Sequence, residues 1–180
     1  MQIRHIKLNN SDNTLFTLAK KEDLNSLEMM INEAYRGERG WTRETELVSG
    51  TRISFEELNN ILKDEQKYLF VLKNDQQKYA CICIEKRKSY AYLGLLVVNP
   101  DMQTKGIGKK VLSLAEEFIV TVLQRDTVEI AVIKQREELV SFYKRRGFKE
   151  INQIQAYPKN SDVGTPKVEG LQVVFLEKKL

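Results

Sequence analysis

The segment Gln103-Thr104-Lys105-Gly106-Ile107-Gly108 has a composition suited to binding an anion. It stands between an apolar strand pattern and an amphipathic helix pattern, so its glycines fall at a helix N-terminus. The first backbone N–H groups of a helix have no intrahelical acceptor and lie at the positive end of the helix dipole. Glycines let a diphosphate approach those groups, and Lys105, Lys109 and Lys110 add positive charge. The alternative is a helix start that needs only a tight turn.

The spacing of the glycines excludes two common phosphate-binding motifs. The dinucleotide fingerprint G-x-G-x-x-G would need a glycine at position 111, where this chain has Val111. The P-loop would need a glycine five residues before Gly108, where this chain has Gln103. The predicted anion site therefore belongs to neither class.

The elements around this segment are predicted to form a parallel crossover. An apolar run over 90–98 predicts a strand, which Asn99-Pro100 ends because proline cannot donate a hydrogen bond to a sheet. Apolar residues at helical spacing over 107–122 predict a helix, and the run over 128–133 predicts the next strand. A strand, a helix and a strand in this order form a right-handed crossover.

The rest of the pattern adds strands and helices on both sides of that unit. Strands are expected at 15–18, 68–72, 79–85, 148–156 and 171–176. Helices are expected from Leu24, with Asp23 as N-cap and Gly37 as stop, from the Ser54-Phe55-Glu56-Glu57 capping box to about Lys63, and over 137–146 with Gly147 as C-terminal cap. A long loop spans 37–53. We therefore expect a single mixed α/β domain over residues 1–180, with a mostly antiparallel twisted sheet of six to seven strands and helices on both faces.

A second segment, Ser141-Phe142-Tyr143-Lys144-Arg145-Arg146-Gly147-Phe148, closes the helix that follows the crossover. The segment 103–108 resembles the Q/R-x-x-G-x-G/A motif of the GNAT superfamily of N-acetyltransferases, placed after a strand that ends in Val-x-Pro. The segment 141–148 is similar to the F-Y-x-x-x-G-F helix end of the same family. The order of the elements from about Leu15 to Leu176 also matches, so the resemblance covers nearly the whole chain.

The resemblance implies acetyl-coenzyme A as co-substrate and implies no metal. The main chain of Leu96 to Val98 would pair with the pantetheine arm like an added strand. The N–H groups of Gln103 through Gly108 would hold the diphosphate. The family splays two neighbouring strands here, and Gly94 would help that distortion. The expected cofactor-binding residues are Leu96, Val97, Val98, Gln103, Thr104, Lys105, Gly106, Ile107, Gly108 and Lys109.

The resemblance also implies roles in direct acetyl transfer to a primary amine in a ternary complex. Tyr143 matches the family tyrosine that protonates the leaving thiolate, and its ordinary pKa near 10 keeps it protonated at neutral pH. Packing of an amphipathic aromatic under the cofactor is the alternative for Tyr143. Glu85 is a candidate base, against the alternatives of a surface carboxylate without a catalytic role and of a water chain.

The loop that contains Trp41, Thr42 and Glu44 lies where the family places its acceptor-binding region, and these three are the expected substrate-binding residues. Long loops often carry function. Trp41 is equally explained as an anchor that pins the loop to the core. Arg52 fits either an ion pair with an acceptor carboxylate or one with a neighbouring glutamate.

Composition narrows the class of protein further. The chain has 180 residues, 42% hydrophobic and 30% charged, with a formal net charge of +4, which is typical of a soluble globular protein without a basic nucleic-acid stripe. Its only histidine is His5, so no Ser-His-Asp machinery and no zinc site are expected. Cys81 and Cys83 fit two small core residues in a reducing compartment better than a disulfide or a metal pair.

The sequence also predicts the compartment of the protein, its partners and its acceptor. The absence of a signal-peptide pattern and of a long apolar run predicts a cytoplasmic protein without membrane or nucleic-acid partners. The family often forms homodimers. The resemblance favours a small amine as acceptor. The alternatives are a protein N-terminus or lysine, and a domain that binds acyl-coenzyme A to regulate without turnover.

Overall fold

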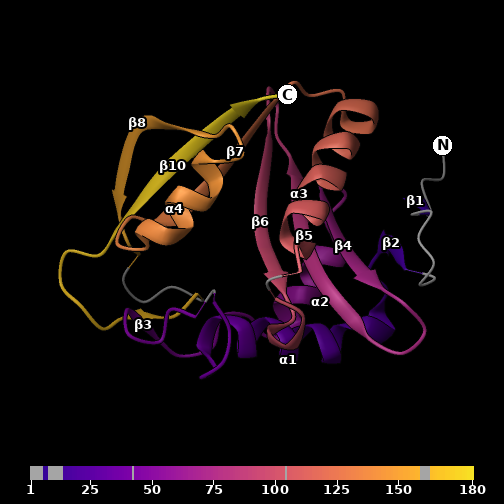
Figure 1. Cartoon of the computed structure of the whole chain (residues 1–180), viewed down its shortest axis with the longest axis horizontal. Coiled ribbons are helices and arrows are strands. Elements are labelled where there is room, and N and C mark those ends of the chain that lie inside the picture. The colour runs from indigo at the N-terminus through magenta and orange to yellow at the C-terminus, as the bar shows by residue number, and fades with distance from the viewer. Residues whose placement is uncertain (1–5, 8–13, 42, 104, 159–162) are drawn as a thin grey trace.

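The computed structural model describes residues 6–7, 14–41, 43–103, 105–158 and 163–180. An eight-stranded sheet runs through this part of the chain in the order β1-β2-β4-β5-β6-β7-β10-β8 (Figure 1). Its strands are β1 (Ile6–Lys7), β2 (Leu15–Leu18), β4 (Lys67–Lys73), β5 (Lys78–Lys86), β6 (Ala91–Val98), β7 (Thr127–Ile133), β8 (Lys149–Ala156) and β10 (Gln172–Lys179). Only β6 and β7 pair in parallel, so the predicted mixed, mostly antiparallel sheet is confirmed, with the two-residue β1 as an additional strand.

Helices cover both faces of the sheet, as the sequence predicts (Figure 1). One core contains residues of α1 (Leu24–Arg36) and α2 (Phe55–Lys63), and the other contains residues of α3 (Ile107–Phe118) and α4 (Glu137–Lys144). Short turns complete the helical elements: 3₁₀ turns at Lys21–Asp23 and Pro100–Met102, and a π-helical turn at Ile119–Leu123 that continues α3. Among the described residues, no helix is both long and apolar enough to cross a membrane.

The parallel contact between β6 and β7 is short. Only the first residues of each strand pair, from Ala91 opposite Val128 to Leu93 opposite Ile130. Figure 1 shows the two strands close together at one end and diverging toward the other, where α1 lies. The remaining backbone of β6 therefore faces a gap in the sheet rather than a partner strand.

A β-bulge in β6 begins where the pairing with β7 ends. On its other side, β6 pairs with β5 in a register that shifts between Cys81 and Cys83, so Leu95 and Leu96 both stand opposite Ile82. Leu95 has a φ of 50°, a left-handed conformation that costs a residue with a side chain about 1–2 kcal/mol. Gly94, which is expected to help this distortion, directly precedes the bulge, and the left-handed backbone falls on Leu95.

After the bulge, the buried side chains of β6 point to the opposite face of the sheet. Residues two apart on a regular strand face the same side. Here Ala91 and Leu93 lie in the core of α3 and α4, whereas Leu95 and Val97 lie in the core of α1 and α2. Burying a leucine side chain contributes about 1.5–3 kcal/mol, which offsets the cost of the left-handed backbone at Leu95.

Two long loops are joined at the side of the sheet. The segment 37–53, which the sequence predicts as a loop, contains β3 (Val48–Ser49), and β3 pairs with β9 (Thr165–Pro166) from the loop before β10. The predicted capping box is confirmed, because Ser54 Oγ accepts from Glu57 N and the Glu57 carboxylate accepts from Ser54 N. Local sequence thus sets the start of α2, while a distant segment holds the loop before it.

Asp23 occupies the predicted N-cap position of α1, but its side chain caps no N–H of that helix. One carboxylate oxygen accepts from Lys20 N at 2.9 Å, and the other lies 2.7 Å from Lys73 Nζ and 3.3 Å from Lys78 Nζ. Burial opposes the charge of Asp23, but these bonds together hold the pKa of its carboxyl below the ordinary value. The carboxylate ties α1 to β4 and β5.

We expect Asp23→Asn to lower the free energy of unfolding by about 2 kcal/mol at neutral pH, because the lysine bonds lose their charge. A carboxyl with a lowered folded pKa stabilises above its ordinary pKa of 3.8, and this contribution disappears as pH falls through the folded value. Urea unfolding at several pH values should therefore show the difference shrinking in acid. A difference that stays constant down to pH about 2 would contradict this assignment.

Candidate functional site

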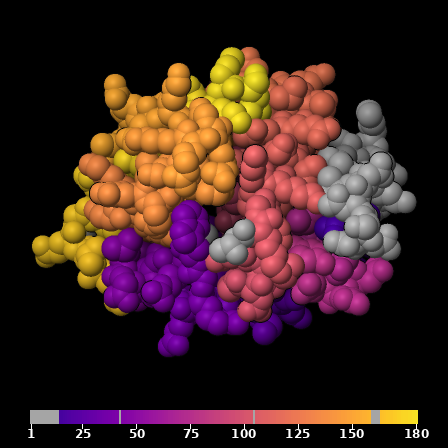
Figure 2. Space-filling model, viewed as in Figure 1, coloured from indigo at the N-terminus to yellow at the C-terminus, as the bar shows by residue number. Residues whose placement is uncertain are grey.

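A cavity of about 340 Å³ opens at the N-terminus of α3. It is bounded by β6, by the segment before α3, by α4 and by the loop after α1. Figure 2 shows the surfaces of α3, α4 and the α1 region meeting on one face of the molecule. Its lining residues are Trp41, Leu96, Val98, Gln103, Gly106, Ile107, Gly108, Lys109, Leu139, Phe142, Tyr143 and Arg146. The structure thus brings together both sequence segments, 103–108 and 141–148, around one space.

The N-terminus of α3 presents backbone donors to this cavity. Gly106 begins the helix with a φ of 74°, and no side chain of a described residue caps the helix there. The first intrahelical bond runs from Lys110 N to Gly106 O. A Cβ at Gly108 would lie 3.5 Å from Val98 Cγ2 and 3.7 Å from Phe142 Cζ, so a side chain would extend into the cavity. The missing side chain leaves room for a ligand against the helix start.

The side chains of some residues expected in the cofactor site do not line the cavity. The Val97 side chain is buried in the core of α1 and α2, on the opposite side from Leu96; the contact expected of Val97 is through its main chain, and that contact stays a prediction. Lys105 is exposed and does not line the cavity. Thr104 and Thr42 lie outside the described residues.

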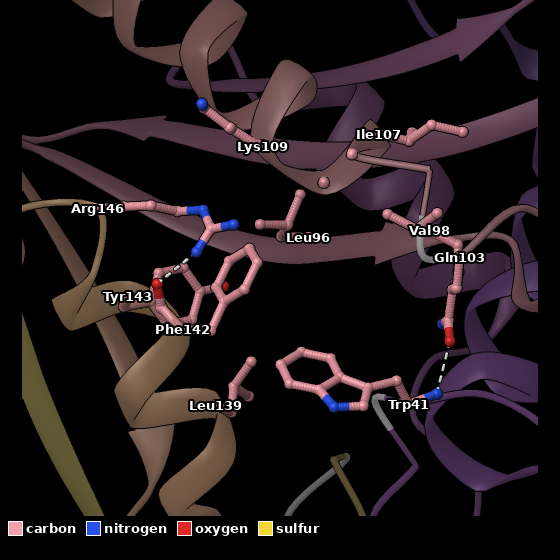
Figure 3. Close-up of a pocket in the computed structure, with 12 residues that line it drawn as sticks. Trp41, Leu96, Val98, Gln103, Ile107, Lys109, Leu139, Phe142, Tyr143 and Arg146 are labelled. Carbon is pink, nitrogen blue, oxygen red and sulfur yellow. Dashed lines mark hydrogen bonds between the residues drawn. The ribbon is translucent and has the colours of Figure 1, made fainter.

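Trp41 lies at the wall of this first cavity (Figure 3). Its backbone N–H donates to Gln103 Oε1 at 2.6 Å, and Gln103 Nε2 donates to Val98 O at 3.2 Å. The indole ring faces Phe142 across the cavity at a centroid distance of 5.7 Å. The sequence expects Trp41 at the acceptor, whereas here it shares a wall with Gln103 at the N-terminus of α3.

Arg146 covers the outer side of Phe142. Its guanidinium carbon stands 3.4 Å from the ring centroid, and Nη1 donates to Phe142 O at 2.7 Å (Figure 3). The Nε atom is buried with no hydrogen-bond partner among the described residues. Sequence reasoning missed Leu139, Phe142 and Arg146 as lining residues, although Phe142 and Arg146 stand within the 141–148 motif.

A second cavity of about 250 Å³ occupies the gap between the diverging strands. Its walls include residues 92–96 of β6 and 130–133 of β7, with side chains from α1, α4 and both long loops. Leu96, Leu139 and Tyr143 line this cavity and the first one as well. The two cavities therefore adjoin at Tyr143.

Tyr143 is the polar group at this junction. It is 3% exposed, and burial, reinforced by neighbouring Tyr35, raises the pKa of its hydroxyl well above the ordinary value. Phe142 and Phe148 pack edge-on against its ring and fix its position. A buried hydroxyl with a raised pKa stays protonated at neutral pH, so it can donate a proton or a hydrogen bond.

Charged groups of the second cavity are mostly paired. Glu44, 7% exposed, forms an ion pair with Arg36, which also donates to Gly50 O at 3.0 Å and Val163 O at 2.7 Å. Arg136, 3% exposed, donates to Glu138 Oε1 at 2.9 Å. Glu44 was expected to bind substrate; its carboxylate lines the cavity and holds the loops of its wall together. Sequence reasoning did not identify Tyr35, Tyr92, Arg136 or Tyr157 as lining residues.

Glu85, the candidate base, lies in a separate hollow. That hollow is lined by Glu57, Asp64 and Lys67 among others, and it does not include Tyr143. Arg87 pairs with the Glu85 carboxylate at 2.9 Å. The structure therefore does not bring Glu85 and Tyr143 to one cavity. Among the described residues, no group of three or more His, Cys, Asp or Glu side chains could hold a metal ion.

The sequence matches one family model, described as the acetyltransferase (GNAT) domain, over residues 31–158. No curated protein matches the chain significantly. The fold resembles many solved structures.

Three of the solved structures with a similar fold are the following proteins. A chimera of the spermidine N-acetyltransferase SpeG from Vibrio cholerae with hSSAT has a TM-score of 0.68 at 18% identity, covering 93% of this chain and 95% of that chain. The ribosomal-protein-S18-alanine N-acetyltransferase from Escherichia coli has a TM-score of 0.66 at 16% identity, covering 92% and 93%. The protein smu.2055 from Streptococcus mutans UA159 has a TM-score of 0.69 at 13% identity, covering 91% and 98%. At these identities the likeness shows the fold alone.

We expect Glu44→Ala to lower the free energy of unfolding by about 3 kcal/mol, because it leaves the buried Arg36 guanidinium without its carboxylate. The exposed Glu46, two residues away, supplies the matched control, and Glu46→Ala should change stability by less than about 0.5 kcal/mol. Urea unfolding of both variants measures the difference. Equal stability of the two would contradict a structural role for the pair.

Proposed function

The chain belongs to the GNAT family of acetyltransferases, and we propose that it transfers the acetyl group of acetyl-coenzyme A to the primary amine of a small molecule. The observation that carries this proposal is the meeting of the two cavities at Tyr143. A donor in one cavity and an acceptor in the other would come together at a single proton-donating group. That arrangement suits direct transfer in a ternary complex, without an acyl-enzyme intermediate.

The first cavity has hydrogen-bond donors and a positive charge that suit the diphosphate and the pantetheine of coenzyme A. The diphosphate would lie against the start of α3, which no side chain of a described residue caps and where Gly106 and Gly108 keep side chains out of the way. Lys109 lines the same space and adds positive charge. The pantetheine arm would follow the edge of β6 at Leu96 and Val98, where β7 has diverged and cannot pair.

Two steps of the transfer fall to groups at the junction. Backbone N–H groups of β6 near Leu96 stabilise the oxyanion that forms when the amine attacks the thioester carbon. The Tyr143 hydroxyl, which is protonated at neutral pH and lies at the junction of the two cavities, donates a proton to the departing thiolate. Acetyl-coenzyme A supplies the activated acyl group.

Loss of the amine proton falls to water in the second cavity. Glu44 is the only carboxylate among the described residues that line this cavity, and it is paired with Arg36. Glu85 lies in another hollow and pairs with Arg87, so we assign it no role in the transfer. A volume of about 250 Å³ is at the small end of ligand pockets, which favours a small acceptor over a folded protein surface.

Gly108→Ala should separate stability from cofactor binding. The added methyl makes only ordinary contacts and removes a helical glycine, so the free energy of unfolding should rise by about 0.5 kcal/mol. The same methyl occupies the space of the ligand, so the rise in melting temperature on adding acetyl-coenzyme A should shrink. Thermal unfolding with and without millimolar acetyl-coenzyme A measures both effects. An undiminished ligand shift in the variant would place the diphosphate elsewhere.

Tyr143→Phe should lower kcat by about 100-fold or more, because the thiolate loses its proton donor. The KM for acetyl-coenzyme A should change little, since the ring and its packing remain. Tyr68→Phe is the matched control, because Tyr68 packs against Phe118 and lines neither cavity. Thiol release over a panel of amines measures turnover. Unchanged turnover of Tyr143→Phe would refute the proton-donor role.

A further inference from the structure

Arg52 lines the second cavity and forms no ion pair with a carboxylate of the described residues. It stands in the segment before α2 and lines the cavity together with Tyr143. Its guanidinium carbon lies 5.2 Å from the ring centroid of Tyr35. Among the described residues, no carboxylate oxygen lies within 4.0 Å of its guanidinium nitrogens, although eleven other Lys and Arg side chains of this part of the chain form such pairs.

The backbone of Arg52 is fixed by Asn32 of α1. Asn32 Oδ1 accepts from Arg52 N at 2.6 Å and from Ile53 N at 3.2 Å, and Asn32 Nδ2 donates to Ile53 O at 2.7 Å. The helix α1 thus holds the backbone of both residues through one amide side chain. Such a clamp reduces the conformational freedom that an arginine would lose on binding a ligand.

Of the charged side chains described in the lining of this cavity, Arg52 is the one that forms no ion pair. Glu44 is paired with Arg36, and Arg136 is paired with Glu138. The tyrosines of the cavity stay neutral, because burial raises the pKa of each of their hydroxyls: Tyr35, Tyr92, Tyr143 and Tyr157. The positive charge of Arg52 opposes that rise at three of them: Tyr35, Tyr92 and Tyr157. Its field therefore spreads through the cavity.

The carboxylates of the adjoining hollow are also occupied. Arg52 lines that hollow as well. Glu57 accepts from Ser54 N and Oγ in the capping box, Asp64 pairs with Lys67 at 3.3 Å, and Glu85 pairs with Arg87. None of these carboxylates has an oxygen within 4.0 Å of the Arg52 guanidinium nitrogens, although Glu57, which accepts from neutral donors, keeps its negative charge in the same hollow.

We propose that the acetyl acceptor carries a carboxylate in addition to its amine, and that Arg52 binds this carboxylate. This inference rests on the proposed transfer reaction and names the class of its acceptor: an amino acid or a related small amine with a carboxylate. A guanidinium offers paired N–H donors that match the two oxygens of a carboxylate. With the carboxylate at Arg52, the amine of the same molecule is free to face the junction at Tyr143.

The same charge disfavours a polyamine as acceptor. A polyamine carries several positive charges and would place one of them beside an unpaired arginine in a partly enclosed space, where like charges repel more strongly than in water. Two of the similar structures described above are a polyamine acetyltransferase and a ribosomal-protein acetyltransferase by name, so the acceptor differs among proteins of this fold. The acceptor of this chain therefore follows from its own cavity.

The test compares amines that differ only in the carboxylate. The common L-amino acids, their carboxamides and spermidine are offered to the wild-type protein, to Arg52→Gln and to Arg145→Gln. Arg145 is exposed in the turn after α4 and lines neither cavity, so its variant removes one positive charge without touching the site. Two readouts are taken with each compound: thiol release from acetyl-coenzyme A, and the melting-temperature shift in the presence of coenzyme A.

The wild type should acetylate at least one amino acid, and its carboxamide and spermidine should be at least about tenfold poorer in kcat/KM. Arg52→Gln should lower kcat/KM for that amino acid at least about tenfold while changing that for the carboxamide by less than about twofold. Arg145→Gln should behave as wild type. Equal or better use of carboxamides or spermidine by the wild type overturns the inference, as does an equal loss on both substrates in Arg52→Gln.

The two readouts separate this inference from the proposed reaction. If an amino acid raises the melting temperature of the wild type but not of Arg52→Gln, and no thiol is released with any amine, the carboxylate site stands and the transfer reaction is wrong. If thiol is released with other amines while no amino acid raises the melting temperature, the transfer reaction stands and the carboxylate site is wrong.

Discussion

The bulge at Leu95 and Leu96 is the constraint on which the rest of the site depends. It gives β6 two residues opposite one of β5, and the pairing of β6 with β7 ends where it begins. It also moves the buried side chains of the strand from one core to the other, so each half of β6 is held by different helices. The gap that results joins a cavity on the α3 side to a cavity between the strands, with Tyr143 at the junction.

The electrostatic character of each cavity is set by the polar and charged groups of its lining that have no partner within the described part of the protein. The first cavity meets backbone N–H groups at the start of α3, which suit an anionic ligand. The second is lined by neutral tyrosines and by charges that are paired within the protein, apart from Arg52. Asn32 and the Arg36–Glu44 pair hold the loops that carry these groups. Long loops thus form a defined wall, because buried polar contacts with α1 fix them.

Local patterns in the sequence predicted the local features. The glycines at 106 and 108, the capping box at Ser54 and the burial of Cys81 and Cys83 follow from neighbours within a few residues, and the crossover from β6 to β7 follows from the order of the elements. Features that depend on distant partners were missed or misplaced. The N-cap position of Asp23 was predicted but its ion pairs with Lys73 and Lys78 were not, and nothing in the sequence indicates that Leu95, next to Gly94, adopts the left-handed backbone. The clamp by Asn32 and the pairing of β3 with β9 leave no signal at short range.

A crystal structure with acetyl-coenzyme A bound would test the central claim most directly. We expect the diphosphate against the first turn of α3, the pantetheine along Leu96 and Val98 where β7 has diverged, and the thioester at Tyr143 facing the second cavity. A cofactor bound away from the gap between β6 and β7, or a thioester that does not reach the junction of the two cavities, would contradict it.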